Sequence, residues 1–179
     1  ESGCEVPSAF QVELKSKAQG VRLYRAARPE GHDMLYVVRH DVELLYAFPY
    51  ESSRKRMSVI VRLPPALLES VGGGAPVRLY CKGADNVILE RLRDADQASG
   101  DEERMVAQSR EHVSQFAEDG LRTLLISKRE LTEEFYKGWK ERYDAAALSL
   151  TNRKQKTEAI MDEVESDLQL LGVTGIEDR

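Results

Sequence analysis

An α+β fold, with a twisted antiparallel sheet flanked by helices, is what the order of the sequence patterns predicts. Short runs rich in Val, Leu and Tyr, separated by turn residues, fill most of the chain up to residue 82, and such runs are typical of strands. Beyond residue 85 the apolar residues recur every three to four positions, as they do on helices that bury one face. Because the strands come first and are joined by hairpin-like links, they are expected to pair antiparallel.

Six segments of the chain are predicted as strands. They are residues 21–24, 34–40, 42–48, 57–63, 77–82 and 121–127. The fourth strand is closed by Pro64 and Pro65, because proline cannot continue it. Residues 66–76, which contain three consecutive glycines, are expected to form a long flexible connection to the fifth strand.

Helical spacing near the start of the chain predicts a first helix. Phe10, Leu14 and Ala18 recur every four residues, and Gly20 is a suitable C-terminal stop.

Four further helices are expected in the second half. One follows Gly83, one ends at Gly120, one begins at Thr132, and the last covers about residues 154–171. Acidic residues directly after Thr132 suit the positive end of a helix dipole. On that helix Phe135, Trp139 and Tyr143 recur at four-residue spacing, so we assign them to the core.

Composition excludes several classes of function. The chain has 179 residues, with 26 Lys+Arg against 31 Asp+Glu, and a formal charge of −5 argues against a nucleic-acid binder that relies on positive charge. No apolar run approaches the roughly 20 residues that span a bilayer.

Cys4 and Cys81 show no metal-ligand spacing and indicate a reducing compartment. His32, His40 and His112 are scattered, so neither a metal site nor a catalytic residue is predicted. Since the chain does not begin with Met, we expect a piece of a longer protein.

The first segment that could carry function is residues 48–58. It places aromatic residues, among them Tyr50, just before the basic triad of residues 54–56. A ring and several cations at the end of a strand could form one rim of a pocket. A solvated basic loop explains the same residues, and the segment alone does not decide between the two interpretations.

Two further segments each bring a cation to a strand end. Lys82 is followed by Gly83, which allows close approach of a ligand or of backbone, and by Asp85, where a helix N-cap belongs. A capped strand-to-helix turn accounts for the glycine and the aspartate but not for the lysine. Arg122 interrupts an apolar strand, so it must either escape at the strand end or meet an anion.

Taken together, these segments resemble the cytosolic nucleotide-binding domain of P-type ATPases, and most closely that of the phospholipid flippases. The matching blocks are RKRMSV at 54–59, LYCKGAD at 79–85, VILERL at 87–92, FAEDGLRTL at 116–124 and DLQLLGVTGIED at 167–178. The resemblance covers residues 48–179, and it is specific because the blocks occur together in the same sequence order.

The resemblance implies a domain that holds ATP so that its terminal phosphate reaches an Asp on a neighbouring domain, with Mg²⁺ expected as MgATP in the full-length protein. By matched position, Tyr50 replaces the family's adenine-stacking Phe and keeps its π-face. Ser52 and Lys55 match positions that line the same pocket. Lys82, with Gly83 beside it, matches the Lys at the base of the adenine pocket.

At the other end of the expected site, Arg122 matches the Arg that reaches the phosphates, and Thr123 matches its neighbour. The N-terminal part departs from the family. Its adenine-contacting Glu falls on Ala9 when the chain is counted back from Gly20 without a gap, whereas a shifted register would keep Glu5. Losing that acceptor would weaken adenine recognition by about one net hydrogen bond, ~0.5–1.5 kcal/mol.

The resemblance also sets the expected boundaries and partners. Residues 1–171 would be the nucleotide-binding domain, and residues 172–179 the hinge that returns to the phosphorylation domain. The partners implied are ATP and the phosphorylation and actuator domains of the same polypeptide, with phospholipid reached only through the full-length protein. This would be a cytosolic domain of an integral membrane protein. The alternative is a degenerate flippase-like module, regulatory or structural and possibly fused to a signalling enzyme, which the changes at Ala9 and Tyr50 motivate.

Overall fold

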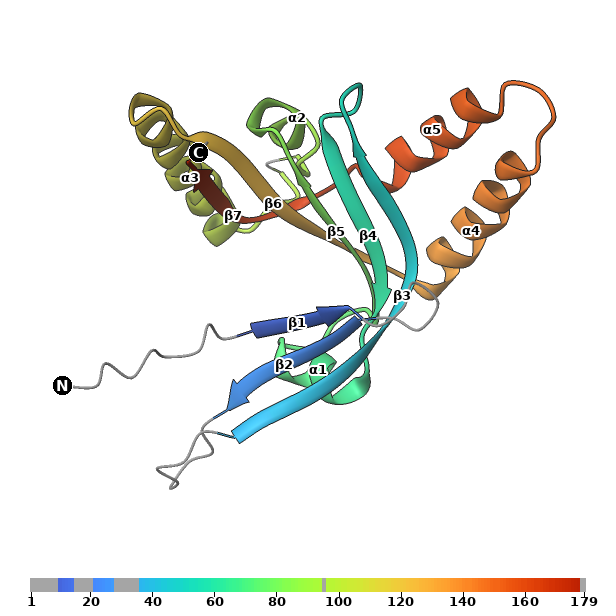
Figure 1. Cartoon of the computed structure of the whole chain (residues 1–179), viewed down its shortest axis with the longest axis horizontal. Coiled ribbons are helices and arrows are strands. Elements are labelled where there is room, and N and C mark those ends of the chain that lie inside the picture. The colour runs from blue at the N-terminus through green and yellow to red at the C-terminus, as the bar shows by residue number, and fades with distance from the viewer. Residues whose placement is uncertain (1–9, 15–20, 28–35, 95, 178–179) are drawn as a thin grey trace.

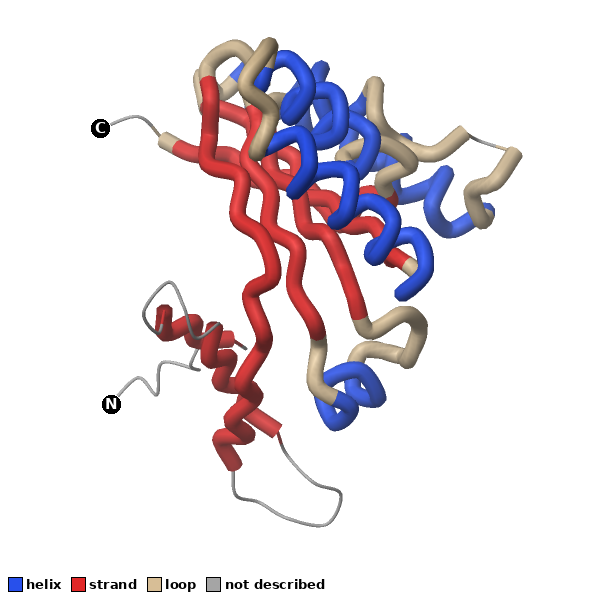
Figure 2. The backbone as a smooth tube through the Cα atoms, turned by 90° about the vertical axis from the view of Figure 1, so that its right-hand side faces the viewer, coloured by secondary structure: helices blue, strands red, loops and turns tan. Residues whose placement is uncertain are grey.

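A computed structural model of the chain describes residues 10–14, 21–27, 36–94 and 96–177, and for residues before His40 it describes the backbone alone. In these ranges the chain forms one sheet with helices gathered mainly on one side of it (Figures 1 and 2). The residue Ala9 and the predicted helix stop at Gly20 lie outside the described residues.

The sheet contains seven described strands in the order β1-β2-β3-β4-β5-β6-β7, each antiparallel to its neighbours. They are β1 (Phe10–Leu14), β2 (Val21–Ala27), β3 (Tyr36–Glu51), β4 (Arg56–Arg62), β5 (Val77–Gly83), β6 (Arg122–Leu131) and β7 (Gln169–Ile176). The predicted α+β class with an antiparallel sheet is confirmed.

The long strand β3 connects two parts of the sheet. Its first half pairs with β2 and its second half pairs with β4. The two strands predicted at 34–40 and 42–48 are therefore one continuous strand (Figure 1). In the second part, Met57, Lys82 and Ile126 are direct neighbours across β4, β5 and β6.

Five helices occur in the described part of the chain. They are α1 (Pro65–Ser70), α2 (Asp85–Leu89), α3 (Gly100–Glu118), α4 (Glu133–Ala147) and α5 (Arg153–Val164). Ser99 and Glu102 form a reciprocal capping box at the start of α3. The predicted helix start at Thr132 is confirmed, because its hydroxyl accepts a hydrogen bond from the Phe135 amide at 3.1 Å.

Side chains alternate along each strand, so the sheet has two different faces. We call one the helix-covered face, because α2, α3, α4 and α5 contribute to the core packed against it (Figure 2). Its strand residues are Arg56, Ser58 and Ile60 of β4, Leu79 and Cys81 of β5, and Leu125 and Ser127 of β6. At the centre of the core, Trp139 is fully buried and stacks on Tyr143 at 5.2 Å between ring centroids, which confirms the predicted aromatic stripe.

The opposite side we call the open face. Its residues in the same strands are Met57 and Val59 of β4, Tyr80 and Lys82 of β5, and Leu124 and Ile126 of β6. The short helix α1 covers the far end of this face, where Leu67 packs with Val61 and Leu63. The segment predicted as a flexible connection thus contains a helix, because Pro64 and Pro65 suit a helix start as well as a strand end.

Two of the predicted helices are wrong in type or length. Residues 10–14 form a strand, since Phe10, Val12 and Leu14 also alternate with period two and pair with β2. The last helix ends at Val164 rather than at residue 171. Asp167 adopts a left-handed backbone conformation, with φ of 55°, and the chain then enters β7.

Candidate functional site

A shallow hollow on the open face crosses three strands. Its volume is about 160 Å³, and the residues that line it are Met57, Ser58, Val59, Tyr80, Cys81, Lys82 and Ile126. Because Met57 and Ile126 lie on either side of Lys82 in the sheet register, the lysine rises from an apolar floor. A flat apolar surface beside an ammonium group suits a ligand that combines an aromatic ring with negative charge.

Lys82 is half-buried and has no ion pair or side-chain hydrogen bond with any residue in the described ranges. Charged side chains that are partly buried usually have such a partner. The structure therefore places an available cation at the edge of the apolar hollow.

The turn between β3 and β4 borders the same end of the sheet. Tyr50, at the end of β3, is 57% exposed, and Ser52 and Lys55 in the turn are also exposed. Lys55 has a left-handed backbone with φ of 51°, and its amide donates a hydrogen bond to the carbonyl of Glu51 at 2.7 Å. A ring and a second cation are thus presented to solvent beside the strand that carries Met57.

Gly83 joins this turn to the strand that carries Lys82. A Cβ at position 83 would lie 2.6 Å from the Arg56 Cβ and 2.8 Å from the Lys55 carbonyl oxygen. In addition, the Ala84 amide donates a hydrogen bond to the Lys55 carbonyl at 3.0 Å. The glycine is therefore required by the close approach of the backbone, one of the two alternatives that the sequence left open. The N-cap of α2 is Ala84, one residue before the predicted Asp85.

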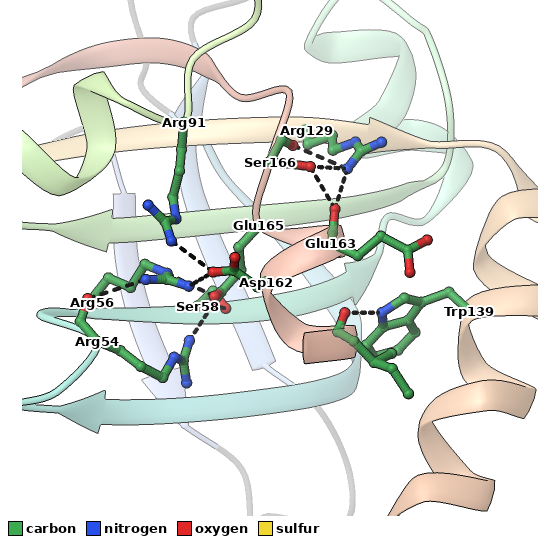
Figure 3. A network of polar contacts seen from close by, with 11 residues as sticks. Arg54, Arg56, Ser58, Arg91, Arg129, Trp139, Asp162, Glu163, Glu165 and Ser166 are labelled. Carbon is green, nitrogen blue, oxygen red and sulfur yellow. Dashed lines mark hydrogen bonds and ion pairs between the residues drawn. The ribbon is translucent and has the colours of Figure 1, made fainter. Parts of the chain in front are cut away.

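The two arginines of the basic triad face away from the open face. Arg54 and Arg56 are buried and both form ion pairs with Glu165, which is fully buried just after α5 (Figure 3). The Arg56 Nε lies 2.7 Å from Glu165 Oε2, and the hydroxyl of Ser58 donates to Oε1 at 2.5 Å. The two arginines do not form a solvated loop; together with Arg91 and Asp162 they line a separate pocket of about 360 Å³ beside α5.

Asp162 extends this network toward the surface. Its Oδ1 accepts hydrogen bonds from Arg56 at 2.5 Å and from Arg91 at 2.7 Å (Figure 3). Burial opposes ionisation of Asp162, but the hydrogen bond and charge of Arg91, helped by Arg56, keep its pKa below its ordinary value. The network thus links α5, β4 and the segment after α2.

Arg122 and Thr123 lie at the start of β6, at the other end of the site. Arg122 is exposed at the first position of the strand, and it shares the open face with Leu124 and Ile126. The four residue steps from Ile126 to Arg122 span about 13 Å of strand. Thr123 has the opposite parity, which it shares with the core residue Leu125, so its side chain belongs to the helix-covered face. The hollow and Arg122 together give the open face an extended site with cations near both ends.

Cys81 lies beneath the hollow, between Ser58 and Ser127 in the sheet register. It is 1% exposed. Burial, together with the nearby charge of Glu165, raises the pKa of its thiol to about 12. A thiol in this state is a poor nucleophile, so we assign it a packing role.

Sequence reasoning missed the floor of the hollow and the carboxylates behind it. Tyr80 and Ile126 could have been found, because they share the parity of Lys82 and Arg122 within the predicted strands. Glu165 and Asp162 carry no such signal, since the side chains that they bind are at least 71 residues away in sequence.

Two further features concern metal binding and membrane spans in the described part of the chain. No group of three or more His, Cys, Asp or Glu among them is arranged to hold a metal ion. None of the helices in the described ranges is long and apolar enough to cross a membrane.

The fold and the site define the class of protein. The family described as P-type ATPase, cytoplasmic domain N, matches residues 18–179, and the chain belongs to this family.

The chain is also similar to several phospholipid-transporting ATPases. The chain is 46% identical over 149 residues to phospholipid-transporting ATPase DNF1 of Chaetomium thermophilum, which covers 83% of the chain and 8% of that protein. It is 42% identical over 142 residues to DNF1 of Saccharomyces cerevisiae, covering 79% and 9%. It is 39% identical over 137 residues to phospholipid-transporting ATPase ID of Mus musculus, covering 76% and 10%. The chain thus spans at most a tenth of these relatives.

Proposed function

We propose that this chain is the cytosolic ATP-binding domain of a P-type phospholipid flippase. It would present ATP to the phosphorylated Asp of a neighbouring domain of a longer polypeptide. The observation that supports this most directly is the open-face hollow, where Lys82 stands beside the apolar side chains of Met57 and Ile126.

The residues present fit such a nucleotide. The apolar floor and the exposed ring of Tyr50 suit a purine base, for which an aromatic stack contributes ~1–3 kcal/mol. Lys55, Lys82 and the exposed Arg122 supply positive charge for the base edge and the phosphates. Ser52 and Gly83 lie in the turn and the strand end that border the hollow. For Thr123 we propose a supporting role, given that its side chain belongs to the other face.

The site faces solvent, so we expect weak binding by this chain. A single stack and a few exposed charges leave about −4 kcal/mol after association costs, which corresponds to a Kd on the order of 1 mM. Magnesium would enter as MgATP, held by the phosphates rather than by a protein site.

The proposal includes the remainder of the polypeptide. Residues 1–171 form the nucleotide-binding domain, and residues 172–179 form the hinge toward the phosphorylation domain. Residues 172–176 belong to β7 and pair with β6, so this hinge would leave directly from the sheet. The phosphorylation and actuator domains would be the partners, and phospholipid would be reached only through the whole membrane protein.

A two-dimensional NMR titration of the 179-residue chain with a non-hydrolysable ATP analogue and Mg²⁺ tests the proposal. We expect saturable shifts at Tyr50, Lys82 and Arg122, which Lys82→Ala weakens at least about tenfold, the value of one charge-assisted hydrogen bond.

Lys128→Ala is the matched control, because Lys128 lies on the same face of β6 and pairs with Glu130 at 3.6 Å. It should leave affinity unchanged. Affinity insensitive to Lys82→Ala would contradict the proposed site. An absence of shifts up to about 10 mM, weaker than one stack and two charges should give, would favour the degenerate module instead.

A further inference from the structure

We propose that Glu165 is a positioning residue for the nucleotide site, which holds Lys55 in place from the opposite face of the sheet. This inference rests on the proposed function, because it assigns a role within that same site. It concerns a residue that touches no ligand and lies 110 residues from Lys55 in sequence.

The first observation is the way Glu165 is held. Its carboxylate is fully buried and receives hydrogen bonds from Arg54, Arg56 and Ser58 (Figure 3). Both oxygens are used: Oε1 accepts from Arg54 and Ser58, and Oε2 accepts from Arg56 at 2.7 Å. A buried carboxylate with this many donors fixes the side chains that reach it.

The second observation is the position of Lys55 between those two arginines. Its φ of 51° lies in the left-handed region, which is uncommon for a residue with a side chain. Such a conformation persists where the surroundings over-determine it. Here Arg54 and Arg56 anchor the backbone on either side of Lys55, and the Arg56 Nη1 also donates to the Arg54 carbonyl at 3.2 Å. The anchored arginines thus close a tight turn around Lys55.

The third observation connects Lys55 to Lys82. The Lys55 carbonyl accepts a hydrogen bond from the Ala84 amide, and its oxygen lies against Gly83. Lys82 directly precedes this glycine at the end of β5. By fixing the turn, Glu165 therefore also sets where the turn meets the strand that carries the second lysine.

The charge of Glu165 is essential to this role. A glutamine has the same shape, but it offers one acceptor oxygen and turns an NH₂ group toward a donor. Asp162 remains near Arg56 in that case, whereas Glu165 is the carboxylate that pairs with Arg54 among the described residues. Glu165→Gln is thus expected to release the Arg54 side of the turn first.

The test compares the Kd of the non-hydrolysable ATP analogue for wild type, Glu165→Gln, Lys55→Ala and the double variant, measured by NMR titration. Glu165→Gln should weaken binding about tenfold, as for groups that orient a ligand-binding side chain. If it acts through Lys55, the double variant should bind no more weakly than Lys55→Ala alone. In the absence of nucleotide, the Lys55 and Ala84 amide resonances should shift in Glu165→Gln.

Glu163→Gln is the matched control. Glu163 lies near the end of α5, two residues before Glu165, and binds Arg142 at the surface through two hydrogen bonds of 2.6 and 2.7 Å. Its substitution should change neither Kd nor the Lys55 resonance. If Glu165→Gln does not fold, Ser58→Ala removes one of the donors and keeps Glu165 and its two arginines, and it should weaken binding about threefold.

The outcomes separate the two proposals. A wild-type chain that binds no nucleotide would overturn both of them. Normal binding by wild type together with unchanged Kd in Glu165→Gln and Ser58→Ala would overturn the role of Glu165 alone. Fully additive losses in the double variant would also overturn it, because Glu165 would then act independently of Lys55.

Discussion

The two faces of the sheet use the same strand in opposite ways. Along β4, Arg56 and Ser58 turn inward and bind Glu165, whereas Met57 between them turns outward and forms the floor of the hollow. Charges on the helix-covered face are ion-paired and buried. On the open face Lys128 pairs with Glu130, whereas Lys82 and, in the adjoining turn, Lys55 have no ion pair with any described residue.

This difference shows that one sequence motif contributes to both faces of the sheet. Period-two alternation divides the RKRMSV block into residues that pack against the helices and residues that face the other way, where we propose that the nucleotide binds. Substitutions on the helix-covered face should therefore change the free energy of unfolding. Those on the open face should change affinity and leave stability nearly unaltered.

The largest effect is expected for Trp139→Ala in the core. The indole is fully buried, stacks on Tyr143 and donates to the Ile160 carbonyl at 2.9 Å. Its removal should lower the free energy of unfolding by about 3–5 kcal/mol, measured by urea denaturation followed by circular dichroism. Leu150→Ala, at a fully exposed position beyond α4, is the control and should stay within about 0.5 kcal/mol of wild type. Equal effects of the two substitutions would contradict the assigned core.

Tyr50→Ala tests whether an exposed residue of the proposed site changes affinity without changing stability. Because the ring is 57% exposed, the free energy of unfolding should change by less than about 0.5 kcal/mol. ATP-analogue affinity should fall by about 1–3 kcal/mol through loss of the stack, as measured by NMR titration. Tyr50→Phe keeps the π-face and should bind like wild type. If Tyr50→Phe loses as much affinity as Tyr50→Ala, the hydroxyl rather than the ring makes the contact.

Gly83→Ala alters the contact between the turn that joins β3 to β4 and the end of β5. The added Cβ would lie 2.6 Å from the Arg56 Cβ and 2.8 Å from the Lys55 carbonyl oxygen, so the backbone must shift. We expect a destabilisation of about 1–3 kcal/mol in urea denaturation, together with weaker ATP-analogue binding. Gly138→Ala, on α4 with open space around its Cβ, should instead stabilise the chain by about 0.5–1 kcal/mol. A stable, binding-competent Gly83→Ala would show that the turn tolerates movement.

The smallest expected effect concerns the pH dependence of stability. Hydrogen bonds from Arg142, opposed by partial burial, hold the pKa of Glu163 below its ordinary value. A depressed folded-state pKa contributes stability above the unfolded value of about 4.3, and this contribution is lost as the pH falls below it. Since both side chains are more than a third exposed, we expect at most about 0.5 kcal/mol.

Urea denaturation between pH 3 and 7 measures this contribution as the difference between wild type and Glu163→Gln. The difference should shrink toward acidic pH and with added salt. A difference that grows as the pH falls would reverse the assigned sign.

The fold class and most of the strands could be predicted from sequence, because alternation and turn residues are local signals. At Phe10 the pattern predicts a helix and the structure has a strand, since Phe10 and Leu14 fit a four-residue spacing as well as a two-residue one. The last helix was predicted too long for a similar reason: Leu168 fits the helical spacing but lies beyond the left-handed Asp167. In both cases pairing with a neighbouring strand decided the outcome.

For the candidate site, too, only some of the residues could be predicted from the sequence. Lys82 and Arg122 could be selected because each places a cation at the end of an apolar strand. Resemblance to the family's motifs assigns Lys82 and Arg122 roles in nucleotide binding, which are proposals. The ion pairs of Arg54 and Arg56 with Glu165 could not be predicted, since no local pattern relates side chains more than 100 residues apart.

The reactivity of the buried Cys81 thiol can report on opening of the sheet. With a pKa of about 12, it is almost entirely protonated at pH 8 and shielded from alkylating reagents. Once the strands separate, the same thiol recovers an ordinary pKa near 8.5 and reacts. In a Cys4→Ser background, the alkylation rate would therefore count how often β4, β5 and β6 open. A nucleotide bound across these strands should slow this rate in proportion to its occupancy.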